Sequence, residues 1–104
     1  YNVPSRTACD LQPETVGVLS KHPMIVGVKE ATGDMGRVSL LRELCGEDFT
    51  LLSGDDFSVL GFLACGGHGV ISVITNVLPG VLAKMCAAAR AGDFTQARKL
   101  HELH

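Results

Sequence analysis

The sequence lacks a dominant charge, a long hydrophobic run and any closely spaced pair of cysteines. Nine Lys and Arg residues, spread along 104 residues, stand against eleven Asp and Glu residues. Proteins that bind nucleic acid or anionic membranes carry clustered basic residues, so we expect neither partner. No apolar run approaches the roughly eighteen residues of a membrane span, and no basic segment leads into an apolar core at the N-terminus. We therefore expect a cytoplasmic protein whose partner is a small molecule or another subunit.

The four cysteines are Cys9, Cys45, Cys65 and Cys86, separated by 36, 20 and 21 residues. This spacing matches neither a CxxC redox pair nor the paired ligands of a zinc site. Free cysteine is among the most buried residue types. We predict four small apolar side chains in a reducing compartment, and no metal site.

Three short apolar runs at residues 24–28, 49–52 and 69–73 are typical of buried parallel strands. Residues 1–4 predict the tail of another strand, and the absence of a methionine before Tyr1 suggests a piece of a longer chain. Segments with helical spacing separate the runs, as at Val38, Leu41 and Leu44.

Prolines and glycines support the helices between the runs. Pro13 and Pro79 suit first-turn positions, and Gly46 and Gly92 suit the residue after a helix end. A helix is expected after the Asp55-Asp56 pair, whose carboxylates could cap it, and Asp93 could cap a last helix from Phe94.

This order is a run of βα units, which predicts an α/β fold with a parallel sheet, either open and doubly wound or closed as a barrel. No glycine-rich dinucleotide fingerprint follows a strand, which disfavours the open form. We predict that residues 1–104 form the C-terminal half of one (β/α)8 TIM-barrel domain, covering about its last four βα units.

Side chains at the carboxyl ends of barrel strands face the ligand. Lys29 directly follows the apolar run, where burial would keep part of its amine neutral and able to form a Schiff base with a ketone. The alternative is a solvated lysine paired with Glu30. Tyr1 ends the neighbouring strand, about 5 Å away; its hydroxyl could relay protons, or its ring could simply pack at the rim.

Other strand ends offer groups for binding. Arg6, expected in a loop over residues 5–7, could hold a substrate carboxylate by two hydrogen bonds, although a surface arginine is the commoner outcome. Gly54 allows close approach of a ligand to the backbone, and Ile71 lies near the end of the last apolar run. The Gly66–Gly69 segment precedes its strand, so His68 is expected to be structural.

Four motifs in order, Tyr1–Thr7, Val26–Gly33, Leu52–Asp56 and Gly66–Ser72, resemble the dihydrodipicolinate synthase family of class I pyruvate aldolases. The resemblance runs over essentially the whole chain. It implies a homotetrameric TIM-barrel enzyme, a dimer of dimers, that needs no cofactor.

The resemblance also implies the reaction and the roles of the residues. Such an enzyme condenses pyruvate with aspartate 4-semialdehyde to 4-hydroxy-tetrahydrodipicolinate in lysine (diaminopimelate) biosynthesis. Lys29 would form the imine, Tyr1 would relay protons and Arg6 would bind the semialdehyde carboxylate. The Ile71 carbonyl would lie beside the pyruvate, and Gly54 would belong to the substrate site.

Two alternatives remain. A sialic-acid lyase or another keto-sugar-acid aldolase uses the same lysine and tyrosine, although the lyase-like pattern lacks the form of residues 1–7. The chain could also be a non-catalytic half-barrel scaffold, which the intact Tyr1, Lys29 and Arg6 argue against.

The 104-residue segment alone is expected to be inactive. A half-barrel leaves unpaired sheet edges, which favour association or misfolding. The measurement is an assay of the purified segment with pyruvate and aspartate semialdehyde, and detectable turnover would refute the expectation.

Overall fold

The computed structural model describes all residues from Tyr1 to His104. Its helices and strands alternate along the chain as the βα pattern predicts. The elements, in order, are α1 (Pro4–Thr7), α2 (Pro13–Leu19), β1 (Gly27–Glu30), α3 (Met35–Cys45), β2 (Thr50–Ser53), α4 (Val59–Ala64), β3 (Gly69–Val70), the 3-10 helix η1 (Ile74–Asn76), α5 (Pro79–Arg90) and α6 (Phe94–His101).

Helix ends follow the punctuation of the sequence. Pro13 and Pro79 occupy the first positions of α2 and α5, where a missing amide hydrogen costs no helical bond. Gly46 ends α3 with a positive φ of 82°, which an L side chain would strain. Asp93 accepts a hydrogen bond from the Gln96 amide and so caps α6, as predicted.

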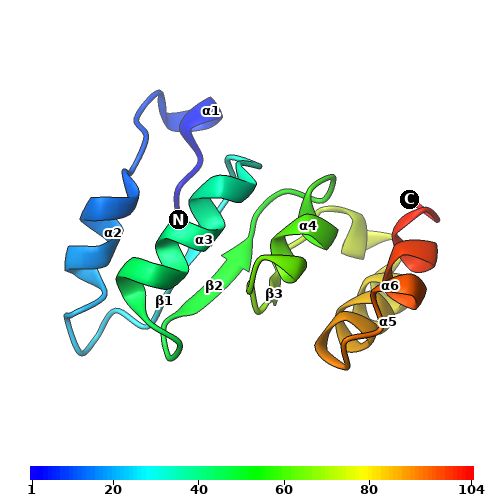
Figure 1. Ribbon diagram of the computed structural model, residues 1–104. Coiled ribbons are helices and arrows are strands. Elements are labelled where there is room, and N and C mark those ends of the chain that lie inside the picture. Colours follow the sequence, from blue (N-terminus) through cyan, green and yellow to red (C-terminus); the bar gives the residue numbers. More distant parts are fainter.

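The three strands form a parallel sheet in the order β1-β2-β3. Gly27 of β1 pairs with Thr50 of β2, and Ser53 of β2 pairs with Val70 of β3. Asn2 adds a parallel bridge to Glu30 on the free side of β1, which confirms the predicted strand tail. In Figure 1 the chain proceeds from the β1 edge of the sheet to the β3 edge, and α2, α3 and α4 lie in that order along the layer of helices.

The predicted strand limits are wrong by one to three residues. The first strand is Gly27–Glu30 and not 24–28, because Met24 lies outside the sheet with 81% of its surface exposed. The second strand begins at Thr50, one residue after the predicted start. The third ends at Val70, although the Ile71 amide still donates to the Ser53 carbonyl at 2.9 Å.

The hydrophobic core has two clusters, one between the sheet and the helices that cover it and one among the last three α-helices. The first joins α2, α3, the strands and α4; the second joins α4, α5 and α6. Their fully buried members include Leu41, Leu51 and Phe62 in the first and Leu82 and Met85 in the second.

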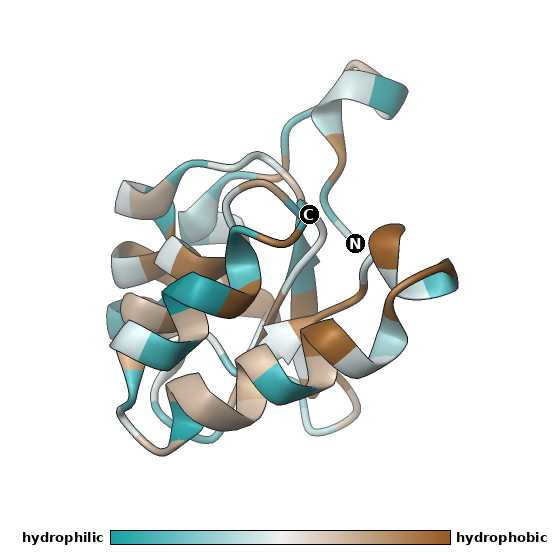
Figure 2. Cartoon of the chain, turned by 90° about the vertical axis from the view of Figure 1, so that its right-hand side faces the viewer, coloured by the Kyte–Doolittle hydropathy of each residue, from teal (hydrophilic) through white to brown (hydrophobic).

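Apolar side chains in the segments just before and after the strands are uncovered. Val26, Phe57, Val73 and Val77 are each at least 69% exposed. In Figure 2, hydrophobic ribbon also lies on the right of the view, near the N-terminus. These side chains are largely open to solvent, whereas the residues between the sheet and the helices are packed.

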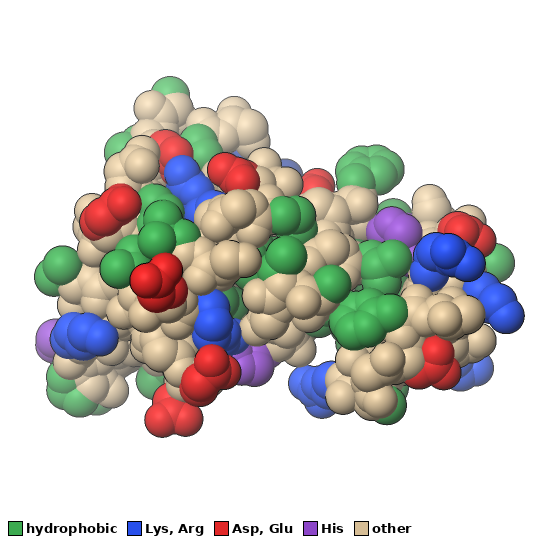
Figure 3. Space-filling model, viewed as in Figure 1, with side chains coloured by type: hydrophobic (Ala, Val, Ile, Leu, Met, Phe, Trp, Pro, Cys, Tyr) green, Lys and Arg blue, Asp and Glu red, His purple; other side chains and the backbone are tan.

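Charges of both signs are interspersed on the helix-bearing face, where Figure 3 shows Lys and Arg beside Asp and Glu. None of the helices combines the length and the apolar character that crossing a membrane requires.

Gly67 and Gly80 provide a matched test of the core. A Cβ at Gly67 would lie 2.1 Å from Cδ1 of Phe62, whereas one at Gly80 would have no neighbour within 4 Å. We expect Gly67→Ala to lower the free energy of unfolding of the whole protein by about 1–3 kcal/mol or more through overpacking. Gly80→Ala should leave it unchanged or raise it by up to about 1 kcal/mol. Urea unfolding measures both, and equal stabilities of the two variants would contradict this packing.

Candidate active site

Tyr1 and Lys29 meet because the chain's first residues pair in parallel with the end of β1. The backbone N–H of Asn2 donates to the backbone carbonyl of Lys29 at 2.9 Å, and the backbone N–H of Ala31 donates to the backbone carbonyl of Asn2 at 3.0 Å. Side chains alternate along a strand. Val28 and Glu30 are buried toward the helices, so Lys29 lies on the other face, beside Tyr1.

Lys29 contacts the ring of Tyr1 and not a carboxylate. Its Nζ lies 4.0 Å from the ring centroid, a cation–π geometry. The contact runs through the ring face, so the expected approach of the hydroxyl to the amine is not what this conformation shows. The alternative of a Lys29–Glu30 pair is wrong, since Glu30 binds groups on the opposite side of the strand. Lys29 is half-buried, and Tyr1 is 62% exposed.

Gly54, just after β2, provides the floor on which Lys29 lies. A Cβ at this position would be 2.9 Å from Cε of Lys29 and 2.8 Å from Cβ of Ala31. The sequence indicated close approach of a ligand at Gly54. The group that approaches in the structure is the lysine side chain, so the glycine fixes where the amine lies.

Ile71 follows β3 at the same edge of the sheet. Its amide donates to the Ser53 carbonyl, while its own carbonyl oxygen accepts no hydrogen bond from the chain. Its side chain is half exposed, at 51%. A free carbonyl at a strand end can accept a hydrogen bond from a ligand.

Arg6 lies on α1 and not in a loop as predicted. Helix α1 is at the top of the view in Figure 1, on the side toward which β2 runs. The side chain is exposed and takes part in none of the ion pairs of the structure. The guanidinium is therefore available to an anion.

The two aspartates after Gly54 cap different segments. An Asp55 carboxylate oxygen accepts the Ser58 amide at 3.1 Å, just before α4, as predicted for a cap. The Asp56 carboxylate instead accepts the amides of Val73 and Ile74, ahead of η1. The prediction for Asp56 is thus wrong; it ties the loop after β2 to the loop after β3.

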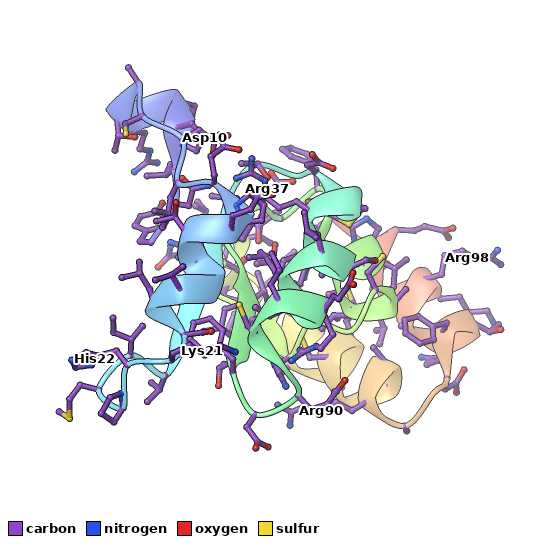
Figure 4. All side chains as sticks on the ribbon, turned by 60° about the vertical axis from the view of Figure 1, so that its left-hand side comes forward. Asp10, Lys21, His22, Arg37, Arg90 and Arg98 are labelled. Atoms are coloured by element: carbon purple, nitrogen blue, oxygen red, sulfur yellow. The ribbon has the colours of Figure 1, made fainter.

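A polar cluster behind the strands was not anticipated from the sequence. Asn2, Asp10, Glu30 and Arg37 are joined by hydrogen bonds, and we call them the Asn2 cluster. Figure 4 shows Arg37 of α3 beside Asp10. Nη2 of Arg37 lies 2.7 Å from Oδ2 of Asp10. The hydrogen bonds from Arg37, and then that from Asn2, lower the pKa of Asp10, and Asp10 in turn raises the pKa of Arg37.

The prediction for His68 is confirmed, and the prediction for the cysteines is confirmed only in part. His68 is structural: its Nδ1 accepts the Leu51 amide at 3.0 Å, and its own amide donates to the Leu51 carbonyl. All four cysteines are free; three are half-buried, whereas Cys9 is exposed, so the prediction of a small apolar side chain that fills space is wrong for Cys9. Burial raises the pKa of the Cys86 thiol.

A parallel sheet with a lysine and a tyrosine side by side at its carboxyl edge, and helices on the outer side, is the architecture of part of a (β/α)8 barrel. A sequence model of the dihydrodipicolinate synthetase family matches residues 1–103. The chain belongs to this family, and its predicted TIM-barrel fold is confirmed.

Individual relatives agree. The 4-hydroxy-tetrahydrodipicolinate synthase of Shigella dysenteriae serotype 1 is 56% identical over 98% of this chain and 35% of its own length. The dihydrodipicolinate synthase of Aquifex aeolicus superposes with a TM-score of 0.95 at 42% identity, covering 99% of this chain and 36% of that one. The chloride-inhibited enzyme of Acinetobacter baumannii complexed with pyruvate gives 0.93 at 39% identity, covering 98% and 35%. The chain thus spans about a third of the length of the relatives it matches.

Gly54→Ala tests the floor beneath Lys29. The new methyl group would displace Cε of Lys29 or the Ala31 side chain. If Lys29 reacts with substrate, its misplacement by about 1 Å would lower kcat of the whole protein by about a hundredfold. Gly69→Ala is the control, since its nearest neighbour, Cδ2 of Leu52, would be at an ordinary 3.6 Å. Equal activity of the two variants would contradict the assignment.

Proposed function

We propose that the whole protein containing this chain is a Schiff-base-forming 4-hydroxy-tetrahydrodipicolinate synthase. It condenses pyruvate with L-aspartate 4-semialdehyde in lysine biosynthesis through the diaminopimelate route. The observation that carries the proposal is the placement of the Lys29 amine against Tyr1, on the open face of a parallel sheet in a chain of this family. The pyruvate complex of the Acinetobacter baumannii relative supports the first substrate.

In the proposed reaction, Lys29 is the nucleophile. Its neutral amine attacks the ketone carbon of pyruvate to give a carbinolamine, which takes up a proton and loses water to leave a protonated imine. The imine is an electron sink, so the adjacent methyl group loses a proton and becomes an enamine. The enamine carbon then attacks the aldehyde carbon of the semialdehyde, and the alkoxide that forms takes up a proton. The amino group of the semialdehyde portion then attacks the re-formed imine carbon and displaces the Lys29 amine, which closes the ring and frees the enzyme.

Tyr1 is the proposed proton relay. The ring-face contact attracts the ammonium form of Lys29 and loses its electrostatic part when the amine is neutral. Deprotonation therefore releases the ring, and the phenol can turn its hydroxyl toward the carbinolamine and later toward the alkoxide. General acid–base catalysis requires hydrogen-bond reach, which this rotation would supply.

The remaining groups bind substrate. Arg6, exposed and without an ion pair, would hold the semialdehyde carboxylate through two hydrogen bonds. The unpartnered Ile71 carbonyl would accept a hydrogen bond beside the pyruvate, and Gly54 would complete the floor of the site. The chemistry we propose uses no cofactor.

The whole protein is also proposed to be a single TIM-barrel domain in which further strands cover the exposed Val26, Val73 and Val77. We propose a cytoplasmic homotetramer, a dimer of dimers. The segment on its own would be inactive because the inner face of its sheet is open to water.

A keto-sugar-acid aldolase is the competing activity, because it would use the same Lys29 and Tyr1. The synthase is favoured by the available Arg6 guanidinium and by the activity for which the Shigella relative is named. Assays with pyruvate plus aspartate semialdehyde and with pyruvate plus N-acetylmannosamine, run side by side, separate the two.

Borohydride reduction in the presence of pyruvate tests the nucleophile. We expect the whole protein to gain the mass of one reduced pyruvate, located by peptide mass spectrometry on Lys29. Lys29→Ala should form no adduct and lose activity by at least about a thousandfold, whereas Tyr1→Phe should keep the adduct and lose about 10² to 10⁴ in rate. An adduct on another lysine, or none, would reject the mechanism.

A further inference from the structure

The Asn2 cluster lies directly behind the residues proposed to react. Asn2 follows Tyr1, and Glu30 follows Lys29, so side-chain alternation turns this second pair toward the helices. Both are buried, with 2% of their surface exposed. A buried amide and a buried carboxylate are stable only when their hydrogen-bonding groups have partners.

Asn2 uses every polar group it has. Its backbone amide and carbonyl bond to the two residues that flank Glu30. Its side-chain Nδ2 donates to Glu30 at 3.0 Å and to Asp10 at 2.9 Å, and its Oδ1 accepts the Leu11 amide at 3.0 Å. One residue thus ties the start of the chain to β1 and to the segment before α2.

Arg37 offsets the charge of the cluster. It makes two 2.7 Å hydrogen bonds to the Asp10 carboxylate, and its Nη1 lies 3.8 Å from Glu30. The Glu30 carboxylate also accepts the Thr32 amide at 3.2 Å. The cluster therefore spans α3, β1 and the chain before α2, and removal of one member leaves buried groups unpaired.

The backbone at Asn2 is a single bridge and not an extended ladder of hydrogen bonds. Such a pairing is weak in register, and a slip by one residue would turn Tyr1 to the helix side. The side-chain hydrogen bonds of Asn2 fix the register of this pairing. Only when Asn2 lies opposite Glu30 can its side-chain amide reach both Glu30 and Asp10.

We infer that the Asn2 cluster is a positioning group for the proposed reaction: it holds Tyr1 in register with Lys29 from the far side of the strands. The inference rests on the proposed function, because positioning is meaningful only if these two side chains react. Asn2, Asp10, Glu30 and Arg37 touch no substrate in this scheme and act through Tyr1 and Lys29.

The test uses the whole protein and three changes in the cluster. Asn2→Ala removes both side-chain donor bonds. Asn2→Asp keeps the size of the side chain but turns its donor into a second acceptor facing Asp10 and Glu30. The pair Asn2→Asp with Glu30→Gln restores the net charge and reverses the bond between positions 2 and 30, so that the glutamine amide donates.

The measurements are steady-state kcat and KM for pyruvate and the rate at which borohydride traps the adduct on Lys29. We expect Asn2→Ala and Asn2→Asp to lower kcat and the trapping rate by about a hundredfold, with KM changed by less than about threefold. The paired substitution should recover about tenfold of the loss. It should not recover all of it, because the bond to Asp10 stays broken.

Leu82→Ala is the stability control. Leu82 is buried in the second core cluster, away from the Asn2 cluster, so its truncation lowers the unfolding temperature without moving Tyr1. If Leu82→Ala, at a similar loss of unfolding temperature, lowered kcat as much as Asn2→Ala, the cluster would be merely structural and the inference overturned. If Asn2→Ala does not fold, the comparison of Asn2→Asp with the paired substitution decides, and equal rates of those two would also overturn it.

The two proposals fail differently. A wild-type protein that forms no adduct with pyruvate would reject the proposed function. A wild-type protein that forms the adduct, with cluster variants that trap it at the wild-type rate, would reject the positioning role alone.

Discussion

The parallel pairing of Asn2 with Glu30 is the contact on which the site depends. It brings together two segments 28 residues apart in sequence and places Tyr1 beside Lys29. Apart from this pairing, the first residues contact β1 through the Tyr1 ring and the Lys29 amine, and α1 is a single turn with no buried residue. The proposed chemistry therefore rests on a short strand end stabilised by side chains and not by a long ladder.

The two faces of β1 have different roles, because successive side chains of a strand point to opposite faces. Val28 and Glu30 point to the helices, where one fills the core and the other is bonded within the Asn2 cluster. Gly27 and Lys29 point the other way, and the flat backbone of Gly54 beneath Lys29 leaves the amine room to lie across the sheet. Lys29, the proposed nucleophile, and the buried Glu30 carboxylate can thus be neighbours in sequence without forming an ion pair.

The order of elements and most helix ends could be predicted from the sequence, because prolines, glycines and capping aspartates act locally. Strand limits could not, since pairing decides them. Met24 and Ile25 are as apolar as the residues that follow, yet the strand begins at Gly27, which pairs with Thr50. Gly27 is also the residue that allows the close approach, because a Cβ there would lie 2.6 Å from the Thr50 carbonyl oxygen. Asp56 shows the same limitation: its partners, Val73 and Ile74, follow a different strand.

The positions of Tyr1 and Lys29 at strand ends could be predicted from the sequence, but the residues that hold them there could not. Asn2, Asp10 and Arg37, taken singly, read as ordinary surface residues, and only the fold brings them together. One signal was nonetheless available. If Lys29 faces the ligand, Glu30 must face the helices, and a carboxylate buried there requires a cation or several donors. The helix after β1 has one basic residue in its first turn, Arg37, and that residue lies 3.8 Å from Glu30. The approach of Arg37 to Glu30 could therefore be predicted from the sequence, whereas the contacts that Asp10 and Asn2 make with them depend on the fold.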